Sequence, residues 1–151
     1  MFRILRMMLL GVMLGMPLSA MAGDTWLMLS CCAHHWKRSP DQNEENTGLF
    51  LDHAMSDRGS VVVGSYRNSQ DRMSSFAAVG LRAWETRWGG LAIESRVLFG
   101  AVSGYGSSET SRNNAQAIML PALTVRGRDI GVIVTGVPGV LLGLGLEIRL
   151  P

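Results

Sequence analysis

The last part of the chain, residues 140–150, alternates strictly between two kinds of position. One set is entirely aliphatic and comprises Val140, Leu142, Leu144, Leu146, Ile148 and Leu150. The other set passes through two glycines to charged residues and comprises Leu141, Gly143, Gly145, Glu147 and Arg149. Because successive side chains of a strand point to opposite faces, the pattern predicts one aliphatic and one polar face. A soluble sheet would bury the aliphatic face in a core, whereas a transmembrane barrel would turn it toward lipid.

Strand-like runs of this kind fill the rest of the mature chain. We predict strands over residues 25–35, 47–55, 60–67, 73–84, 91–103, 115–125, 129–136 and 140–150. Most are near the length that a tilted strand needs to cross a bilayer, about 9–11 residues. Turn-rich segments separate them, and no segment reads as a long amphipathic helix. The sequence therefore predicts an all-β protein, an eight-stranded antiparallel up-and-down transmembrane β-barrel over residues 23–151.

The lengths of the connections agree with a barrel whose chain begins on the periplasmic side. The two longest turn-rich segments, 37–46 and 104–114, then fall outside the cell, and the periplasmic turns are short. This asymmetry is typical of outer-membrane barrels. Closure of an even number of strands also removes exposed sheet edges.

The N-terminus predicts export. Arg3 and Arg6 precede an apolar run at residues 7–16, and residues 20–22 read AMA, a small-x-small cleavage site. We expect a signal peptide over residues 1–22, too short to span a bilayer. In a bacterial chain this export, with no later apolar run long enough for a membrane helix, leaves the periplasm, the medium or an outer-membrane barrel, and the strand pattern favours the barrel. The net charge of +2 is too small to indicate nucleic-acid binding.

Charged residues on the inner faces predict a cluster inside the barrel. Its expected members are Arg82, Glu94, Arg96, Glu147 and Arg149. Unpaired charges in a narrow interior are costly, so these residues should pair and brace the barrel. Glycines on the same faces predict a narrow apolar pocket above the cluster, since an eight-stranded barrel can hold one thin ligand.

Cys31 and Cys32 are the only cysteines. Neighbours on a regular strand point to opposite faces, so a bridge between them would be strained. The ordinary interpretation is two small, half-buried residues.

Several short motifs carry a resemblance to a known family. Residues 43–48 read NEENTG and follow a histidine, residues 66–69 read YRNS, and residues 119–125 read MLPALTV, with VPG at 137–139. In this order and spacing they resemble the outer-membrane lipid A palmitoyltransferase family, including its smaller, phage-associated relatives. The resemblance implies an eight-stranded barrel that moves an acyl chain from a phospholipid to lipid A.

The resemblance also implies a site at the outer rim. His35 matches the family's histidine, with His34 as the neighbour that could replace it, and Ser69 matches its serine. Asn68 stands where the family has an aspartate; it lacks the charge that could orient the histidine but keeps a polar donor, so the resemblance implies Asn68 as a third catalytic candidate. A histidine can take a proton from an acceptor hydroxyl, and a serine hydroxyl can donate to an oxyanion or act as nucleophile. The plainer interpretations are a polar strand end for the histidines and a turn for residues 68–69.

Further residues are expected to contact substrate on the same grounds: Asn43, Glu44, Tyr66, Pro121 and Pro138. The resemblance places the two prolines beside a gap in the wall through which lipid enters sideways. Proline cannot donate to a ladder, so it weakens pairing where it lies. The alternative is a bulge at Pro121 and a tight turn at Pro138.

Four functions remain open from the sequence. They are a lipid A acyltransferase, a lipid A deacylase or similar hydrolase, a barrel that has lost its catalysis, and a soluble periplasmic barrel that binds a small lipid. For the first we expect phospholipid and lipid A as partners, a monomer in the outer membrane, and neither a cofactor nor a metal.

Overall fold

The computed structural model describes residues 23–37, 42–106, 114–137 and 139–151. The predicted signal peptide at residues 1–22 and Pro138 lie outside the described residues.

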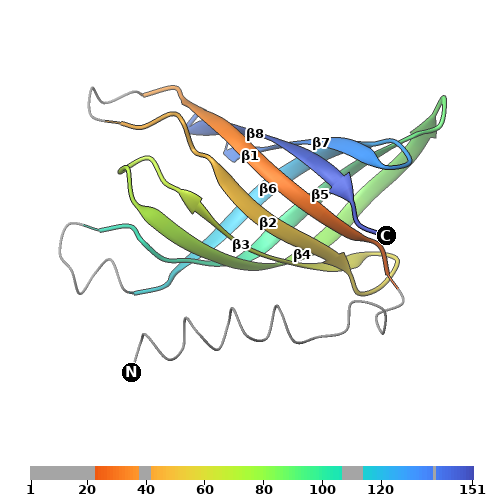
Figure 1. Cartoon of the computed structure of the whole chain (residues 1–151), viewed down its shortest axis with the longest axis horizontal. Helices are drawn as coiled ribbons and strands as arrows, with labels where there is room; N and C mark the ends of the chain where they lie inside the picture. The colour runs from red at the N-terminus through yellow and green to blue at the C-terminus, as the bar shows by residue number, and fades with distance from the viewer. Residues whose placement is uncertain (1–22, 38–41, 107–113, 138) are drawn as a thin grey trace.

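Eight antiparallel strands close into a barrel, as the sequence predicts (Figure 1). They are β1 (Thr25–His35), β2 (Gly48–Ala54), β3 (Gly59–Arg67), β4 (Met73–Trp88), β5 (Leu91–Val102), β6 (Gln116–Arg126), β7 (Ile130–Val137) and β8 (Leu141–Arg149). Each strand pairs with the next in sequence, and β8 pairs with β1 to complete the ring. The described part of the chain contains no helix long and apolar enough to span a bilayer.

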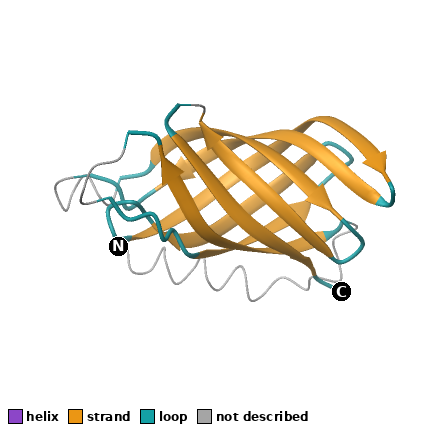
Figure 2. Cartoon of the chain, turned by 90° about the horizontal axis from the view of Figure 1, so that it is seen from above, coloured by secondary structure: helices purple, strands orange, loops and turns teal. Residues whose placement is uncertain are grey.

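The two ends of the barrel differ in the length of their connections. Residues 36–47, 68–72, 103–115 and 138–140 join strands at one end, which we call the long-loop end. Residues 55–58, 89–90 and 127–129 join them at the other, the short-turn end. Figure 2 shows the longer connections gathered on the left and the short turns on the right. The predicted asymmetry of the loops is therefore present.

One element differs from its prediction. Residues 85–90 were expected to form a turn, but β4 continues to Trp88 and only Gly89 and Gly90 turn the chain. Both glycines have positive φ, 55° and 85°, which a two-residue hairpin turn requires. The strands can therefore pair up to Trp88 and Leu91, and this hairpin extends beyond its neighbours (Figure 1).

The outside of the barrel is apolar. On β8, Leu144 keeps 42% of its surface exposed, whereas Glu147 on the opposite face is fully buried in the lumen. Other large apolar side chains are exposed around the ring, among them Leu49, Val61, Val79, Leu81, Phe99, Met119, Leu123, Ile130 and Val132. Soluble monomers rarely expose so extended an apolar surface, so this face is the one suited to lipid.

The lumen is filled at mid-height by an apolar layer. Its buried members are Met28, Val62, Phe76, Ala78, Leu98, Val102, Ala122 and Ile133. Gly64 serves here to admit a neighbouring side chain. At Gly64 an added Cβ would lie 2.5 Å from a ring carbon of Phe50. The aromatic ring therefore occupies the space that a side chain on β3 would need.

The outward face of β8 gives a test of membrane embedding. We expect Leu144→Arg, near the middle of the strand, to destabilise the barrel by about 2–4 kcal/mol in lipid vesicles. The matched change Ile148→Arg, on the same face but near the strand end, should cost about 0–1 kcal/mol, because charge is tolerated near the interface. Urea unfolding in vesicles measures both. Equal costs would indicate a water-facing surface.

Candidate functional site

A narrow cavity occupies the lumen between the apolar layer and the long-loop end. Its volume is about 130 Å³. Met28, Val62, Leu98 and Ile133 line its deep part. His35, Asn46, Tyr66, Ser69 and Tyr105, from separate parts of the chain, also line it. The sequence predicts such a pocket, and the structure brings three predicted site residues, His35, Tyr66 and Ser69, to it.

His35 ends β1 and is 8% exposed, with its side chain on the cavity wall. His34 is different: its side chain is 65% exposed and lies 3.7 Å from a carboxylate oxygen of Glu44. A bulge in β1 determines which of the two histidines faces the cavity, because the β1–β8 register shifts between Ser30 and Cys32. An extra residue in one strand reverses the facing of every side chain beyond it.

The ring of His35 has an unused nitrogen. Its Nδ1 atom is buried and has no hydrogen-bond partner among the described residues. Its backbone N–H donates to the Glu44 carboxylate at 3.3 Å, which fixes the strand end but not the ring. Buried polar atoms are nearly always paired, so an orphaned nitrogen on a cavity wall is a candidate for contact with a ligand.

Asn68 is fully buried, and its side chain ties its own loop to β4 and to the connection after β5. Its side-chain nitrogen donates to Ser74 Oγ at 2.9 Å and to the Gly104 carbonyl at 3.1 Å. Its side-chain oxygen accepts the backbone N–H groups of Gln70 at 2.9 Å and Arg72 at 3.1 Å. A carboxylate could not make the two donations. These four bonds explain an asparagine at this position and hold the loop that presents Ser69.

Asn43 and Glu44 tie this loop to the end of β1. The Asn43 N–H donates to the Ser69 carbonyl at 2.9 Å, and its side chain donates to the Asn68 carbonyl at 3.3 Å. The Glu44 carbonyl accepts the Ala33 N–H at 2.9 Å. Neither residue lines the cavity. Their contacts hold the cavity wall together, and direct contact with substrate stays a prediction.

Three aromatic or amide side chains complete the mouth of the cavity. Tyr66 stacks on Phe50 with ring centres 5.8 Å apart, and its hydroxyl hydrogen-bonds that of Tyr105 at 3.0 Å. Asn46 is buried; its nitrogen donates to the Arg67 carbonyl, and its oxygen has no partner among the described residues. The sequence did not predict Asn46 and Tyr105 as site residues. The signal for Asn46 was its place in the NEENTG motif, directly before β2.

Pro121 lies in β6 with its side chain exposed on the outside. The β5 ladder passes through it, pairing Pro121 with Val97. The β7 ladder runs from Arg126 only as far as the pair Ala122–Thr135, although both strands continue. Leu120, next to Pro121, lines the cavity. Proline has no backbone N–H to donate to a neighbouring strand. In the described part of the chain, β6 and β7 are therefore not paired beside the cavity. Pro138 cannot be placed, since it lies outside the described residues.

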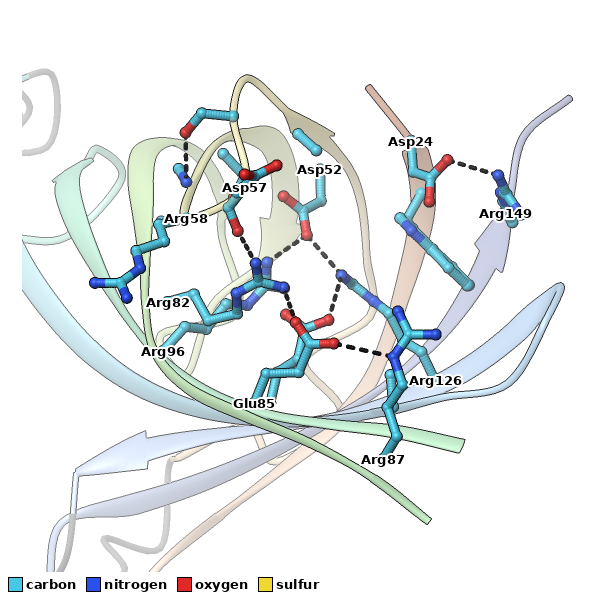
Figure 3. Close-up of a pocket in the computed structure, with 18 of the residues that line it drawn as sticks. Asp24, Asp52, Asp57, Arg58, Arg82, Glu85, Arg87, Arg96, Arg126 and Arg149 are labelled. Atoms are coloured by element: carbon cyan, nitrogen blue, oxygen red, sulfur yellow. Dashed lines mark hydrogen bonds and ion pairs between the residues drawn. The ribbon is translucent and has the colours of Figure 1, made fainter. Parts of the chain in front are cut away.

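Below the apolar layer, four side chains form an ion-pair cluster: Asp52, Arg96, Arg126 and Glu147. Figure 3 shows the first three of these side chains. Asp52 lies 2.5 Å from Arg96 and 2.7 Å from Arg126. Glu147 lies 2.8 Å from Arg126 and 3.4 Å from Arg96. The ring of Trp26 covers the Arg126 guanidinium at 4.7 Å. Each charge therefore has two opposite neighbours, which offsets the cost of burial.

The membership of the cluster differs from its prediction. Arg96 and Glu147 were expected, and Glu94 lies beside them at 3.5 Å from Arg126. Asp52 and Arg126 were missed. Two expected members lie elsewhere, because Arg82 pairs with Glu85 near the short-turn end and Arg149 pairs with the exposed Asp24 at 2.6 Å (Figure 3).

A second cavity of about 370 Å³ opens beneath the cluster at the short-turn end. Arginines and carboxylates line it, including Arg82, Glu85, Arg96 and Arg126. Strands β1, β2 and β5 each place a residue of the upper cavity two positions from a residue of the lower one: Met28 and Trp26, Phe50 and Asp52, Leu98 and Arg96. The lumen is thus split into an apolar upper half and a charged lower half.

We expect an Asp→Asn substitution to cost more stability in the buried ion-pair cluster than in the exposed pair of Asp24 and Arg149. We expect Asp52→Asn to destabilise the barrel by about 3–5 kcal/mol, because it leaves two buried arginines short of charge. The control Asp24→Asn removes an exposed pair and should cost no more than about 1 kcal/mol. Urea unfolding of both variants checks this. A small effect of Asp52→Asn would show that water reaches the cluster and replaces the carboxylate.

Comparisons with known proteins add little to this geometry. No protein-family model matches the chain. No curated protein matches it either. Among solved structures, the N-terminal β-barrel domain of Pseudomonas aeruginosa OprF is similar, with a TM-score of 0.43 and 10% sequence identity over 85% of this chain and 99% of that domain. A likeness of that size bears on neither function nor substrate.

Proposed function

We propose that this protein is a bacterial outer-membrane enzyme that transfers an acyl chain from a phospholipid to lipid A. The observation that carries the proposal is the unpartnered, buried Nδ1 of His35 on the wall of an apolar cavity. An acyl chain matches the apolar lining of the cavity, and a histidine is the side chain best suited to move a proton near neutral pH. The two motifs that resemble the palmitoyltransferase family, residues 43–48 and 66–69, contribute Asn46, Tyr66 and Ser69 to the lining of this cavity.

The outer surface supports a membrane location. Apolar side chains cover the outside of the ring, while charged residues lie in the lumen. This is the reverse of a soluble barrel and fits a lipid-embedded one. Long loops at one end would face the cell exterior, so the cavity mouth with His35 and Ser69 would lie in the outer leaflet, where lipid A is found.

The reaction divides among these side chains as follows. The acyl chain lies in the cavity with its ester carbonyl at the mouth, and a lipid A hydroxyl attacks the carbonyl carbon. His35 takes the hydroxyl proton and returns it to the departing lysophospholipid oxygen. The Ser69 hydroxyl donates to the oxyanion that develops on the carbonyl oxygen. Asn68 positions Ser69 through its hydrogen bonds to Ser74 and to the backbone of Gln70.

Lipid must reach this cavity without leaving the membrane. The stretch where β6 and β7 are not paired supports a sideways entrance for lipid, because it borders the cavity at Leu120 and Thr135. A β-barrel wall is otherwise held by a continuous ladder of hydrogen bonds. Proline at position 121 keeps this part of the ladder open by removing one donor.

A pair of neighbouring histidines gives the decisive experiment. Lipid A from bacteria expressing the chain should gain one acyl group, and His35→Asn should lower the rate of gain about 10²–10⁴-fold, the usual contribution of general base catalysis. His34→Asn is the matched control and should leave the rate unchanged, because its ring faces outward. Ser69→Ala should also lower the rate. Mass spectrometry of lipid A provides the measurement.

Other outcomes would identify the alternatives. Loss of an acyl chain from lipid A would point to a hydrolase of the deacylase type. Unchanged lipid A, with the protein shown to be folded in the outer membrane, would favour a barrel without catalysis. Recovery of the folded protein in the soluble periplasm would favour a lipid-binding barrel.

Pro121 gives a separate test of the entrance. We expect Pro121→Ala to add one ladder hydrogen bond toward β7 and stabilise the barrel by about 0.5–1.5 kcal/mol. Acyl transfer should slow by up to about tenfold, because the same bond must break for lipid to enter. Met119→Ala, on the same exposed face of β6, is the control and should alter neither quantity. Faster transfer in Pro121→Ala would contradict a lateral entrance here.

A further inference from the structure

Cys31 and Cys32 meet in the bulge of β1. Their Sγ atoms lie 2.8 Å apart, and both residues are exposed. A disulfide has a sulfur–sulfur distance of about 2.05 Å, so the two atoms are within about 1 Å of bonding distance. The expectation that these neighbours diverge was wrong, because it assumed a regular strand.

The register shows why they converge. Ser30 pairs with Gly145 and Cys32 with Leu144, so Cys31 is the extra residue that has no partner of its own on β8. The extra residue of a bulge leaves the extended conformation. Its side chain therefore no longer alternates with that of the next residue, and both thiols project on the same side of the strand.

We propose that Cys31 and Cys32 form a disulfide with each other in the exported protein, and that this bond locks the bulge that turns His35 into the cavity. The bulge decides which histidine faces inward, since His35 pairs with Leu141 and His34 with Leu142 only in the shifted register. Without the extra residue, His34 would take the inward face. The disulfide would thus hold β1 in the shifted register, which the hydrogen bonds to β8 alone could allow to change.

The chemistry needs an oxidant of a kind that exported proteins meet. The thiolate of one cysteine attacks the disulfide of a periplasmic thiol oxidoreductase, which forms a mixed disulfide and releases one oxidoreductase thiol. The second cysteine then attacks the mixed disulfide at the first, forming the bond between Cys31 and Cys32. The oxidoreductase leaves as a dithiol and carries the two electrons and two protons.

The bond should also be easily reduced. Adjacent Cα atoms are about 3.8 Å apart, below the range of about 4.4–6.8 Å found in ordinary disulfides. Strained, exposed disulfides are the labile ones. The state of this pair therefore depends on the redox conditions around the protein.

Mass spectrometry tests the bond directly. Protein from the bacterial envelope is quenched in acid, denatured and treated with a maleimide, so that burial or detergent cannot hide a thiol. We expect no maleimide on the chain, a mass lower by two hydrogens than the reduced form, and two maleimides after reduction. Cys31→Ser and Cys32→Ser are matched controls, and each should take one maleimide without reduction. Two maleimides without reductant, or a disulfide between chains, would overturn the proposal.

A second measurement tests the lock on His35. Diethyl pyrocarbonate modifies accessible histidine rings, and fragment masses assign each modified site. In the folded barrel we expect His34 to react fast with or without reductant, and His35 to react faster after reduction. The double variant Cys31→Ser/Cys32→Ser should not respond to reductant. An unchanged rate at His35 in the reduced wild-type chain would overturn the locking role. Neither readout depends on acyl transfer, so failure of the proposed function and failure of this disulfide are distinguishable.

Discussion

The ladder between β1 and β8 is the interaction on which the structure depends. It joins the first strand to the last, from Trp26–Arg149 to His35–Leu141, and so closes the ring. Without it, two strand edges would expose unpaired backbone groups, which water can satisfy but lipid cannot. The same ladder contains the bulge at Cys31, which brings His35 to the cavity. Closure of the barrel and orientation of the candidate base thus come from one set of hydrogen bonds.

The lumen has one end suited to an acyl chain because the opposite end holds the charge. Asp52, Arg96, Arg126 and Glu147 neutralise one another below the apolar layer. Because these charges are paired, Ile133 and Val62, each 1% exposed, can form the apolar bottom of the upper cavity directly above them. An unpaired charge at that level would draw water into the upper cavity. The ion-pair cluster therefore supports the cavity without contacting its contents.

Strand alternation was enough to predict the fold, because period-two patterning survives along most of each strand, as the aliphatic face of β8 illustrates. It failed where a bulge changes the period. The shift at Arg82–Trp84 hid the continuation of β4 to Trp88, and the shift at Ser30–Cys32 left the choice between His34 and His35 open. Long-range pairing was also invisible in the sequence: Asp52 meets Arg126, 74 residues away, across the lumen. The loop contacts of Asn68 follow no periodicity at all.

Two ladders stop short at the long-loop end, but only one gap is covered. The β1–β2 ladder ends at the pair Ser30–Gly48, and above it residues 42–47 continue the wall, with the Glu44 carbonyl bound to the Ala33 N–H at 2.9 Å. The β6–β7 ladder ends at Ala122–Thr135, beside Pro121. In the described residues no segment covers that second gap as 42–47 covers the first. A barrel needs every backbone group satisfied in lipid. The unpaired stretch of β6 and β7 beside Pro121 is therefore costly in lipid, and the lipid entrance proposed above would account for it.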